Sequence, residues 1–191
     1  KVAFNIMQIA DKSDVEIERL GKICSSYPID VLYFADSMGS LKAKQIKKII
    51  TLLKKSWKGE LGIHTHDNMD MALVNTQIAI ECGVTWADST VTGMGRGPGN
   101  SKTEYLVLKY QNEINRKVNI LPLLKLINDE FEPLQKKYKW GTNPFYFLAG
   151  MYGIHPTFIQ GMLNDLRFNS LDILSAIEHL KSIGGKTFNK N

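Results

Sequence analysis

Two histidines, His64 and His66, stand two residues apart in the stretch GIHTHDN, residues 62 to 68. Side chains of a β-strand alternate between its faces, so a strand here would turn both imidazoles toward the same side. In a helix the same spacing would separate them by about 200° around the axis. Converging imidazoles, completed by oxygen ligands, would form a site for zinc, manganese or another divalent ion. The alternative is a pair of strand-end histidines that bond to loop carbonyls.

A glycine-rich loop, GMGRGPGN, occupies residues 93 to 100. Its glycines allow close backbone approach and could cradle a phosphate, but the spacing is not that of a Walker loop. A dinucleotide fingerprint is disfavoured because the loop follows a late strand instead of the first. We favour a loop that folds over the strand ends and turns Asn100 inward, where its carbonyl oxygen is a candidate metal ligand. Arg96 either binds a carboxylate or phosphate or is solvated.

Strands and helices must bring these residues together. The first part of the chain repeats a unit of one strand followed by one helix four times. Short β-rich runs lie at residues 2–7, 30–36, 60–66 and 85–91, each followed by an amphipathic helix. The first helix opens with Ser13 and Glu16 at capping-box spacing. The third is predicted to bury Met71, Val74, Ile78 and Cys82. Four βα units predict an α/β fold with a parallel sheet, whose carboxyl strand ends gather the polar residues.

After about residue 118 the pattern is helical only, cut by Pro, Gly and Asn. The helical stretches are 120–138, 143–153, 155–166 and 170–185. We therefore expect two domains, residues 1–115 with the sheet and residues 116–191 with helices alone.

Composition narrows the class of protein. The chain has 191 residues and a net charge of +5, with much of the lysine excess around one amphipathic helix after Ser40. That pattern is typical of a solvated helix face, so we expect no nucleic-acid partner. No apolar run approaches the roughly 20 residues that span a bilayer, and no signal peptide is evident, so we expect a cytoplasmic protein without a membrane partner. Cys24 and Cys82 are interpreted as small apolar residues in a reducing compartment.

Three stretches together resemble the second half of a pyruvate aldolase of the DRE-TIM metallolyase superfamily, to which hydroxymethylglutaryl-CoA lyase also belongs. They are YFADSMGSL, GIHTHDNMDMALVNTQIAIECGVTWADSTVTGMGRGPGNSKTE and EPLQKKYKWGTNPFYFLAGMYGIHP. Within the superfamily they are most similar to the 4-hydroxy-2-oxovalerate aldolases. The resemblance covers about residues 2 to 160, and its most specific part is the HxHxN strand with the glycine-rich loop ending in Asn. It implies the C-terminal half of a TIM barrel, about four βα units, followed by a small all-α domain.

The resemblance also implies roles for individual residues. His64 and His66 would ligate a divalent metal, with Asn100 as a further ligand or a neighbour of one. Manganese is the favoured ion, and magnesium, cobalt and zinc are alternatives. Tyr152 would be a catalytic proton-transfer residue. The predicted substrate-binding residues are Ser37, Asn68 and Arg96.

By the same resemblance, the activity would be the cleavage or formation of a 4-hydroxy-2-oxo acid, from pyruvate and an aldehyde, through a metal-stabilised enolate. One alternative is a Claisen-type synthase that joins an acyl-CoA to a 2-keto acid, like the isopropylmalate and homocitrate synthases. Another is a non-catalytic scaffold. The substrate would be a small keto acid, and the C-terminal helices would contact an aldehyde dehydrogenase partner. We also expect a homo-oligomer, because half a barrel leaves two sheet edges open.

The chain departs from the family pattern in two places, the first strand of the family's barrel and the glycine-rich loop. That strand ends in an arginine and a metal-binding aspartate, whereas Asp11 and Arg19 of this chain follow a strand that matches the fifth. The lyase relatives also carry a cysteine in the glycine-rich loop, where this chain has Arg96, Gly97 and Pro98. A complete barrel takes about 250 residues. We therefore expect a fragment of a longer protein, with an incomplete active site.

Overall fold

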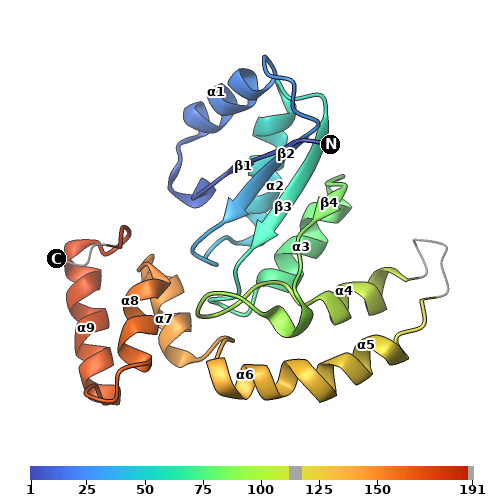
Figure 1. Cartoon of the computed structure of the whole chain (residues 1–191). Helices are drawn as coiled ribbons and strands as arrows, with labels where there is room; N and C mark the ends of the chain where they lie inside the picture. The colour runs from blue at the N-terminus through green and yellow to red at the C-terminus, as the bar shows by residue number, and fades with distance from the viewer. Residues whose placement is uncertain (112–117, 189–191) are drawn as a thin grey trace.

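A sheet of four parallel strands forms the centre of the computed structural model, which describes residues 1–111 and 118–188. The strand order is β1-β2-β3-β4, so each strand pairs with its successor in the chain (Figure 1). The strands are β1 (Ala3–Ile6), β2 (Val31–Asp36), β3 (Glu60–Thr65) and β4 (Trp86–Ala87). The predicted α/β fold with a parallel sheet is confirmed. The fourth strand is shorter than predicted, because the chain turns away from β3 after the bond from Asp88 N to Ile63 O.

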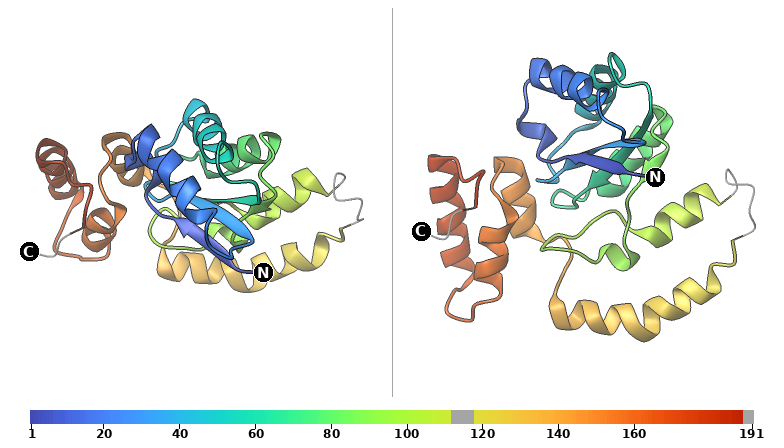
Figure 2. Two further views of the ribbon diagram at one scale, coloured as in Figure 1. Left: turned by 90° about the horizontal axis from the view of Figure 1, so that it is seen from above. Right: turned by 45° about the horizontal axis from the view of Figure 1, so that its top comes forward.

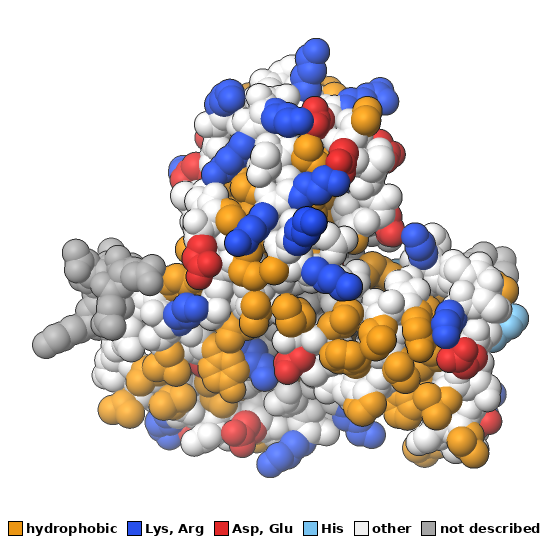
Figure 3. Space-filling view, turned by 180° about the vertical axis from the view of Figure 1, so that it is seen from behind, with side chains coloured by type: hydrophobic (Ala, Val, Ile, Leu, Met, Phe, Trp, Pro, Cys, Tyr) orange, Lys and Arg blue, Asp and Glu red, His pale blue; other side chains and the backbone are white. Residues whose placement is uncertain are grey.

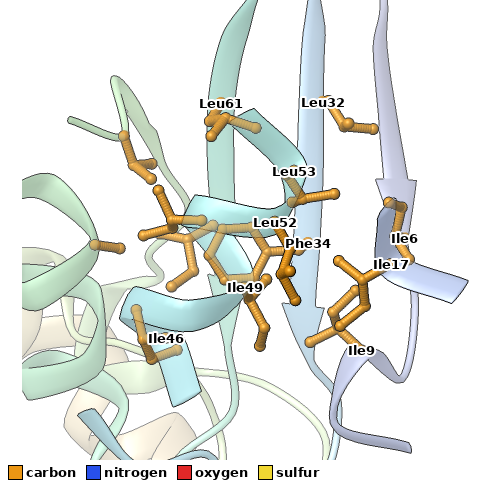
Figure 4. Close-up of a cluster of buried hydrophobic side chains, with 14 of the residues drawn as sticks. Ile6, Ile9, Ile17, Leu32, Phe34, Ile46, Ile49, Leu52, Leu53 and Leu61 are labelled. Atoms are coloured by element: carbon orange, nitrogen blue, oxygen red, sulfur yellow. The ribbon is translucent and has the colours of Figure 1, made fainter. Parts of the chain in front are cut away.

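Three helices cover one face of the sheet. They are α1 (Asp14–Cys24), α2 (Ala43–Lys54) and α3 (Ala72–Glu81). Alternation along β2 and β3 turns every second apolar side chain toward these helices, where they form the larger core (Figure 4). Its strand members include Leu32, Phe34, Leu61 and Ile63, and α2 contributes Ile46, Ile49 and Leu53. The opposite face of the same strands is thereby left for the polar residues.

The start of α1 has the predicted capping box. Ser13 Oγ accepts from Glu16 N at 3.3 Å, and Glu16 Oε2 accepts from Ser13 N at 2.7 Å. These bonds satisfy backbone N–H groups that have no partner within the helix.

The predicted buried face of α3 is partly wrong. Ile78 and Cys82 do pack against the larger core, but Val74 is 41% exposed. The fully buried positions are Ala72, Asn75, Thr76 and Ala79. Small side chains let α3 lie close to β3. Two of its buried polar groups donate hydrogen bonds: Asn75 Nδ2 to Leu41 O at 2.7 Å, and Thr76 Oγ1 to Ala72 O at 2.8 Å. Polar side chains with local partners therefore displaced the apolar ones that periodicity alone favours.

The remaining described elements are helical. They are the 3₁₀ turns Ile9–Asp11 and Val91–Gly93, α4 (Thr103–Tyr110), α5 (Leu121–Leu126), a π-helical turn Ile127–Phe131, α6 (Glu132–Tyr138), α7 (Pro144–Tyr152), α8 (Pro156–Leu163) and α9 (Ser170–Ile183). Helices α7, α8 and α9 lie together at one end of the molecule and enclose a second apolar core (Figure 2). The predicted helices after residue 118 are present, whereas the predicted boundary between residues 115 and 116 lies outside the described residues.

Apolar side chains are also exposed at several places. Val2 and Phe4 flank the free edge of the sheet at β1, and Leu108 and Leu121 are exposed on α4 and α5. Figure 3 shows apolar side chains gathered over the lower half of the molecule seen from behind. Throughout the described ranges, every helix is too short or too polar to cross a bilayer. Apolar surface that is exposed in patches is available for contact with further protein.

Candidate functional site

The two histidines lie together at the carboxyl end of β3. Register between β2 and β3 pairs Tyr33 with Gly62 and Ala35 with His64, on the face that the three helices leave free. The ring centroids of His64 and His66 are 5.1 Å apart, and the ring planes meet at 83°. The strand expected for this stretch is present, and it turns both imidazoles toward the same region as alternation requires.

Both histidines are held through their Nδ1 atoms. His64 Nδ1 is 3.0 Å from Asp88 Oδ2, and His66 Nδ1 is 3.3 Å from Gly99 O. A carboxylate and a carbonyl only accept hydrogen bonds, so both Nδ1 atoms carry a proton, and the neutral form of each ring presents its lone pair at Nε2. Metal-binding histidines are commonly oriented in this way by a carboxylate or a backbone carbonyl. The loop-carbonyl bond expected under the alternative interpretation is thus present, and it fixes the tautomer that a metal ligand needs.

Tyr33 extends this arrangement beneath His64. Its hydroxyl bonds to Asp88, and burial, with a further contribution from Asp88, raises the pKa of Tyr33 to about 12. The phenol therefore stays protonated and donates to the carboxylate. An ideal Cβ at Gly62 would lie 2.5 Å from Tyr33 Cζ, so only glycine leaves room for the ring. The residues that fix the orientation of His64 thus come from three places: Tyr33 from β2, Gly62 from β3 and Asp88 from the end of β4.

The protonation of His66 also suits a ligand. Burial, and then the nearby His64 and Arg96, lower the pKa of His66 to about 4. The ring is therefore neutral at physiological pH, and a cation that binds there displaces no proton from it.

The glycine-rich loop folds back onto the end of β3, as predicted. His66 and Asn100 form an antiparallel bridge, and Asp67 N donates to Gly99 O at 3.0 Å. Gly99 has φ +82°, and a Cβ there would lie 2.2 Å from Gly93 O, so the turn requires glycine. The Asn100 amide donates through Nδ2 to Met94 O at 3.1 Å, while its Oδ1 is buried and has no hydrogen-bond partner among the described residues. A buried amide oxygen at the residue that bridges to His66 is a suitable third ligand for a divalent ion, beside the two imidazole nitrogens.

The described residues do not supply a complete set of strong metal ligands. Within residues 1–111 and 118–188, no group of three or more His, Cys, Asp or Glu side chains is arranged to hold a metal ion. Metal ligation by His64, His66 and Asn100 therefore stays a prediction.

The loop begins in a strained conformation. Thr92 has φ 54°, which is rare for a β-branched residue. Its N–H donates to the buried carboxylate of Glu104 at 3.0 Å, and its carbonyl accepts from Trp140 Nε1 at 3.2 Å. Gly141 N donates to Gly97 O at 2.9 Å, so the segment before α7 holds the loop from the other side. Contacts from two elements thus maintain a backbone shape that is unfavourable in isolation.

Of the predicted substrate-binding residues, Ser37 and Arg96 are brought together. Arg96 Nη2 donates to Ser37 O at 3.4 Å, and Ser37 Oγ accepts from Gln8 N at 2.9 Å. Asn68 instead has no exposed surface, and neither polar atom of its amide has a hydrogen-bond partner among the described residues. It is packed close to Gly39 and Gly150. Substrate binding by these residues stays a prediction.

Two tyrosines of α7 concern the predicted catalytic role, Tyr152 and Tyr146. Tyr152 lies at the end of α7, borders the second core, and has Lys181 Nζ 4.2 Å from its ring centroid. Its catalytic role stays a prediction. Tyr146, six residues earlier in α7, is buried against the glycine-rich loop, where a Cβ at Gly97 would lie 3.2 Å from its ring. Burial raises the pKa of Tyr146 to about 12.

Two other strand-end carboxylates serve the local backbone. Asp36 accepts from Ser40 N at 3.0 Å and from Leu41 N at 3.1 Å, and Asp67 accepts from Ala72 N at 2.9 Å. Burial raises the pKa of each carboxylate to about 6. Both therefore shape the loops that follow β2 and β3.

Sequence reasoning missed Tyr33, Tyr146 and His155 as residues of this region. A sequence signal existed for Tyr33, because two-residue alternation places it on the same face of β2 as Ala35. That it stands opposite Gly62 follows only from the register in which β2 and β3 pair. His155 was a histidine before a proline, which is a helix-start pattern. Its contact with the loop depends on tertiary packing.

A parallel α/β fold that gathers histidines, an asparagine and a glycine-rich loop at its strand ends belongs to the class of α/β proteins with a strand-end active site. The model of the HMGL-like family matches residues 1–129. The chain belongs to the HMGL-like family, which is enzymatic and generally depends on a divalent metal.

Relatives and solved structures agree with this assignment. The chain is 30% identical over 168 residues to 4-hydroxy-2-oxovalerate aldolase of Brevibacillus brevis, a match that covers 86% of the chain and 49% of the relative. It is similar to the N-terminal domain of a putative aldolase from Bacteroides vulgatus, with 30% identity, a TM-score of 0.79, and coverage of 92% of the chain and 57% of that structure. Hydroxymethylglutaryl-CoA lyase of Bacillus subtilis shares the fold, with 22% identity, a TM-score of 0.60, and coverage of 73% and 50%. The structural neighbours are TIM-barrel-like, and the chain spans about half the length of the curated relatives it matches.

Proposed function

We propose that this chain is the second half of a metal-dependent aldolase, which cleaves or forms a 4-hydroxy-2-oxo acid from pyruvate and an aldehyde. The observation that carries the proposal is the orientation of the two histidines. Acceptors hold both Nδ1 atoms and leave two Nε2 lone pairs, beside the unpartnered Oδ1 of Asn100. The names of the curated relatives favour the aldol reaction over Claisen condensation or a scaffold.

The architecture we propose is half of a TIM barrel, formed by residues 1–115, with a helical domain formed by residues 116–191. Four parallel strands in sequential order are what half of such a barrel contains. The free edges of β1 and β4 would pair with the other four strands, and the second core of α7, α8 and α9 supports a separate helical unit.

In this proposal each residue has a separate task. A bound divalent ion, with manganese favoured, would supply Lewis-acid stabilisation of the enolate of pyruvate. His64 and His66 hold the ion, and Asp88 and Gly99 keep their rings in place. Asn100 provides an oxygen. Ser37, Asn68 and Arg96 contact the keto-acid substrate, and Tyr152 is the candidate for proton transfer from the 4-hydroxyl.

The test is pyruvate release by the complete protein from 4-hydroxy-2-oxo acids with added manganese. We expect His64→Ala combined with His66→Ala to lower kcat/KM by more than about 100-fold and to remove bound metal, because both nitrogen ligands are lost. His179→Ala is the matched control, since His179 is exposed on α9. Undiminished pyruvate release in the double variant would refute the proposal.

Two partner proposals follow from the exposed apolar surface. We propose that the helices after residue 118 dock an aldehyde dehydrogenase, and that the protein forms a homo-oligomer. Exposed Leu166 and Leu171 on the helical region, and Leu121 and Leu124 on α5, provide apolar surface for such contacts. Light scattering of the complete protein, alone and with an aldehyde dehydrogenase, tests both.

A further inference from the structure

Arg96 lies in a cluster of hydrogen-bond donors at the junction of the glycine-rich loop and the helical region. Its Nη1 is 3.5 Å from His155 Nε2, its Nη2 donates to Ser37 O at 3.4 Å, and its Nε is buried without a hydrogen-bond partner among the described residues. The Tyr146 ring packs on the same loop at Gly97. Among the described residues, the guanidinium has one acceptor that does not depend on a histidine tautomer, the carbonyl of Ser37, for its five donor hydrogens.

The second nitrogen of His155 shows that this cluster has too few acceptors. His155 Nδ1 is 3.4 Å from Thr157 N, as the cap of α8. A backbone N–H and a guanidinium both donate only, whereas a neutral imidazole has one accepting nitrogen. In either tautomer, therefore, one N–H faces another N–H. If the helix cap is satisfied, the proton is on Nε2, and His155 and Arg96 are two donors that face each other.

Within the part of the chain that the structure describes, no carboxylate forms an ion pair with this arginine. The ion pairs found among the described residues involve other cations: the exposed Arg167, for example, pairs with Asp165. Burial lowers the pKa of the Arg96 guanidinium. A half-buried guanidinium without a counter-ion, beside an imidazole N–H, is the arrangement that binds a carboxylate or phosphate.

We propose that Arg96 and His155 form a subsite for an anionic group, a carboxylate or phosphate, at the aldehyde end of the substrate. This inference rests on the proposed aldolase function. In that function the keto and carboxylate oxygens of the pyruvate portion face the cation held by His64 and His66. The Arg96 guanidinium contacts Ser37 O and the His155 ring, which caps α8. Because the cation takes the carboxylate of the pyruvate portion in the proposed function, the group that Arg96 and His155 bind is a second anion. The substrate class is then a 4-hydroxy-2-oxo acid with an acidic terminus.

The first test measures selectivity in the complete protein. Pyruvate would be condensed with three aldehydes: one that ends in a methyl group, one that ends in a carboxylate and one that ends in a phosphate. We expect Arg96→Gln to lower the ratio of kcat/KM for the preferred anionic aldehyde over the neutral one by about 30- to 100-fold. Arg167→Gln is the matched control, since that arginine is exposed and paired, and its ratio should equal that of the wild type. An unchanged ratio in Arg96→Gln overturns the proposal.

The second test needs no turnover. Calorimetric titration of the complete protein with inorganic phosphate and with succinate should show saturable binding of at least one, lost in Arg96→Gln and weakened in His155→Ala. The probe that binds identifies phosphate or carboxylate as the preferred group. Equal binding by wild type and Arg96→Gln overturns the proposal. If Arg96-dependent anion binding is found but no 4-hydroxy-2-oxo acid yields pyruvate, the proposed function is refuted while the anion site stands.

Discussion

Replacing Gly62 by alanine should push the Tyr33 ring out of its place beneath His64. An added Cβ would lie 2.5 Å from Tyr33 Cε2 and Cζ and 2.6 Å from Cδ2, whereas carbon atoms in contact are about 3.5–4.0 Å apart. The ring must therefore move by about 1 Å. Overpacking of this kind costs about 1–3 kcal/mol. Displacement of the ring also weakens its hydrogen bond to Asp88. Because Asp88 orients His64, that ring should be held less firmly in the variant.

Urea unfolding of the complete protein measures this effect. We expect Gly62→Ala to lower the midpoint at unchanged slope, by an amount equivalent to about 1–3 kcal/mol. In a Tyr33→Leu background the same change should be nearly neutral, because the atoms that the new methyl group meets are gone. Gly161→Ala is the matched control. Apart from the backbone of α8 and the neighbouring residues, no atom of residues 1–111 and 118–188 would lie within 4 Å of its added Cβ, so it should stabilise the helix by about 0.5–1 kcal/mol. A Gly62→Ala loss that is the same with and without the Tyr33 ring would show that the steric argument is wrong.

Three further outcomes are expected. Asp88→Asn should weaken manganese binding by about 10- to 100-fold in calorimetry, because the carboxylate that orients His64 is lost; undiminished affinity would contradict this. The pKa of Asp36 is about 6 in the fold against its ordinary value of 3.8, so the folded state binds more protons between these values and Asp36 should lower stability by about 2 kcal/mol as pH rises from 4 to 6. In pH-dependent unfolding, Asp36→Asn should remove this contribution and leave the similar one of Asp67, whose pKa is also about 6; a decline as large as that of the wild type would exclude Asp36 as a source. Glu104→Ala should cost about 1–3 kcal/mol in thermal unfolding, since it leaves the N–H of Thr92 buried without its acceptor, and no loss would mean that the strained turn holds without it.

The features that the sequence predicts well depend on short-range regularities. Two-residue alternation places His64 and His66 on one side of a strand, and Ser13 and Glu16 mark the start of α1. Glycines 93 to 99 predict a loop that needs backbone freedom, and such a loop is present.

The features that sequence could not supply depend on register and on packing between distant elements. The chain of contacts from Tyr33 through Asp88 to His64 exists only because three strands align at particular residues. The buried face of α3 follows from close approach to β3, which favours small residues over the apolar ones. The contact of Arg96 with His155 joins positions 59 residues apart, and no local pattern records it.

The close approach of α7 to the end of β3 links the helical region mechanically to the histidines. A Cβ at Gly150 would lie 2.8 Å from Met69 Cγ and 3.0 Å from Asn68 Cβ, so the helix backbone rests directly on residues that follow His66 by two and three positions. At this distance the two segments cannot move closer together. A shift of α7 toward the sheet by a fraction of an ångström therefore requires residues 67–69 to move as well. A molecule that binds to the helical region and shifts α7 would therefore change the relative positions of the His64 and His66 rings.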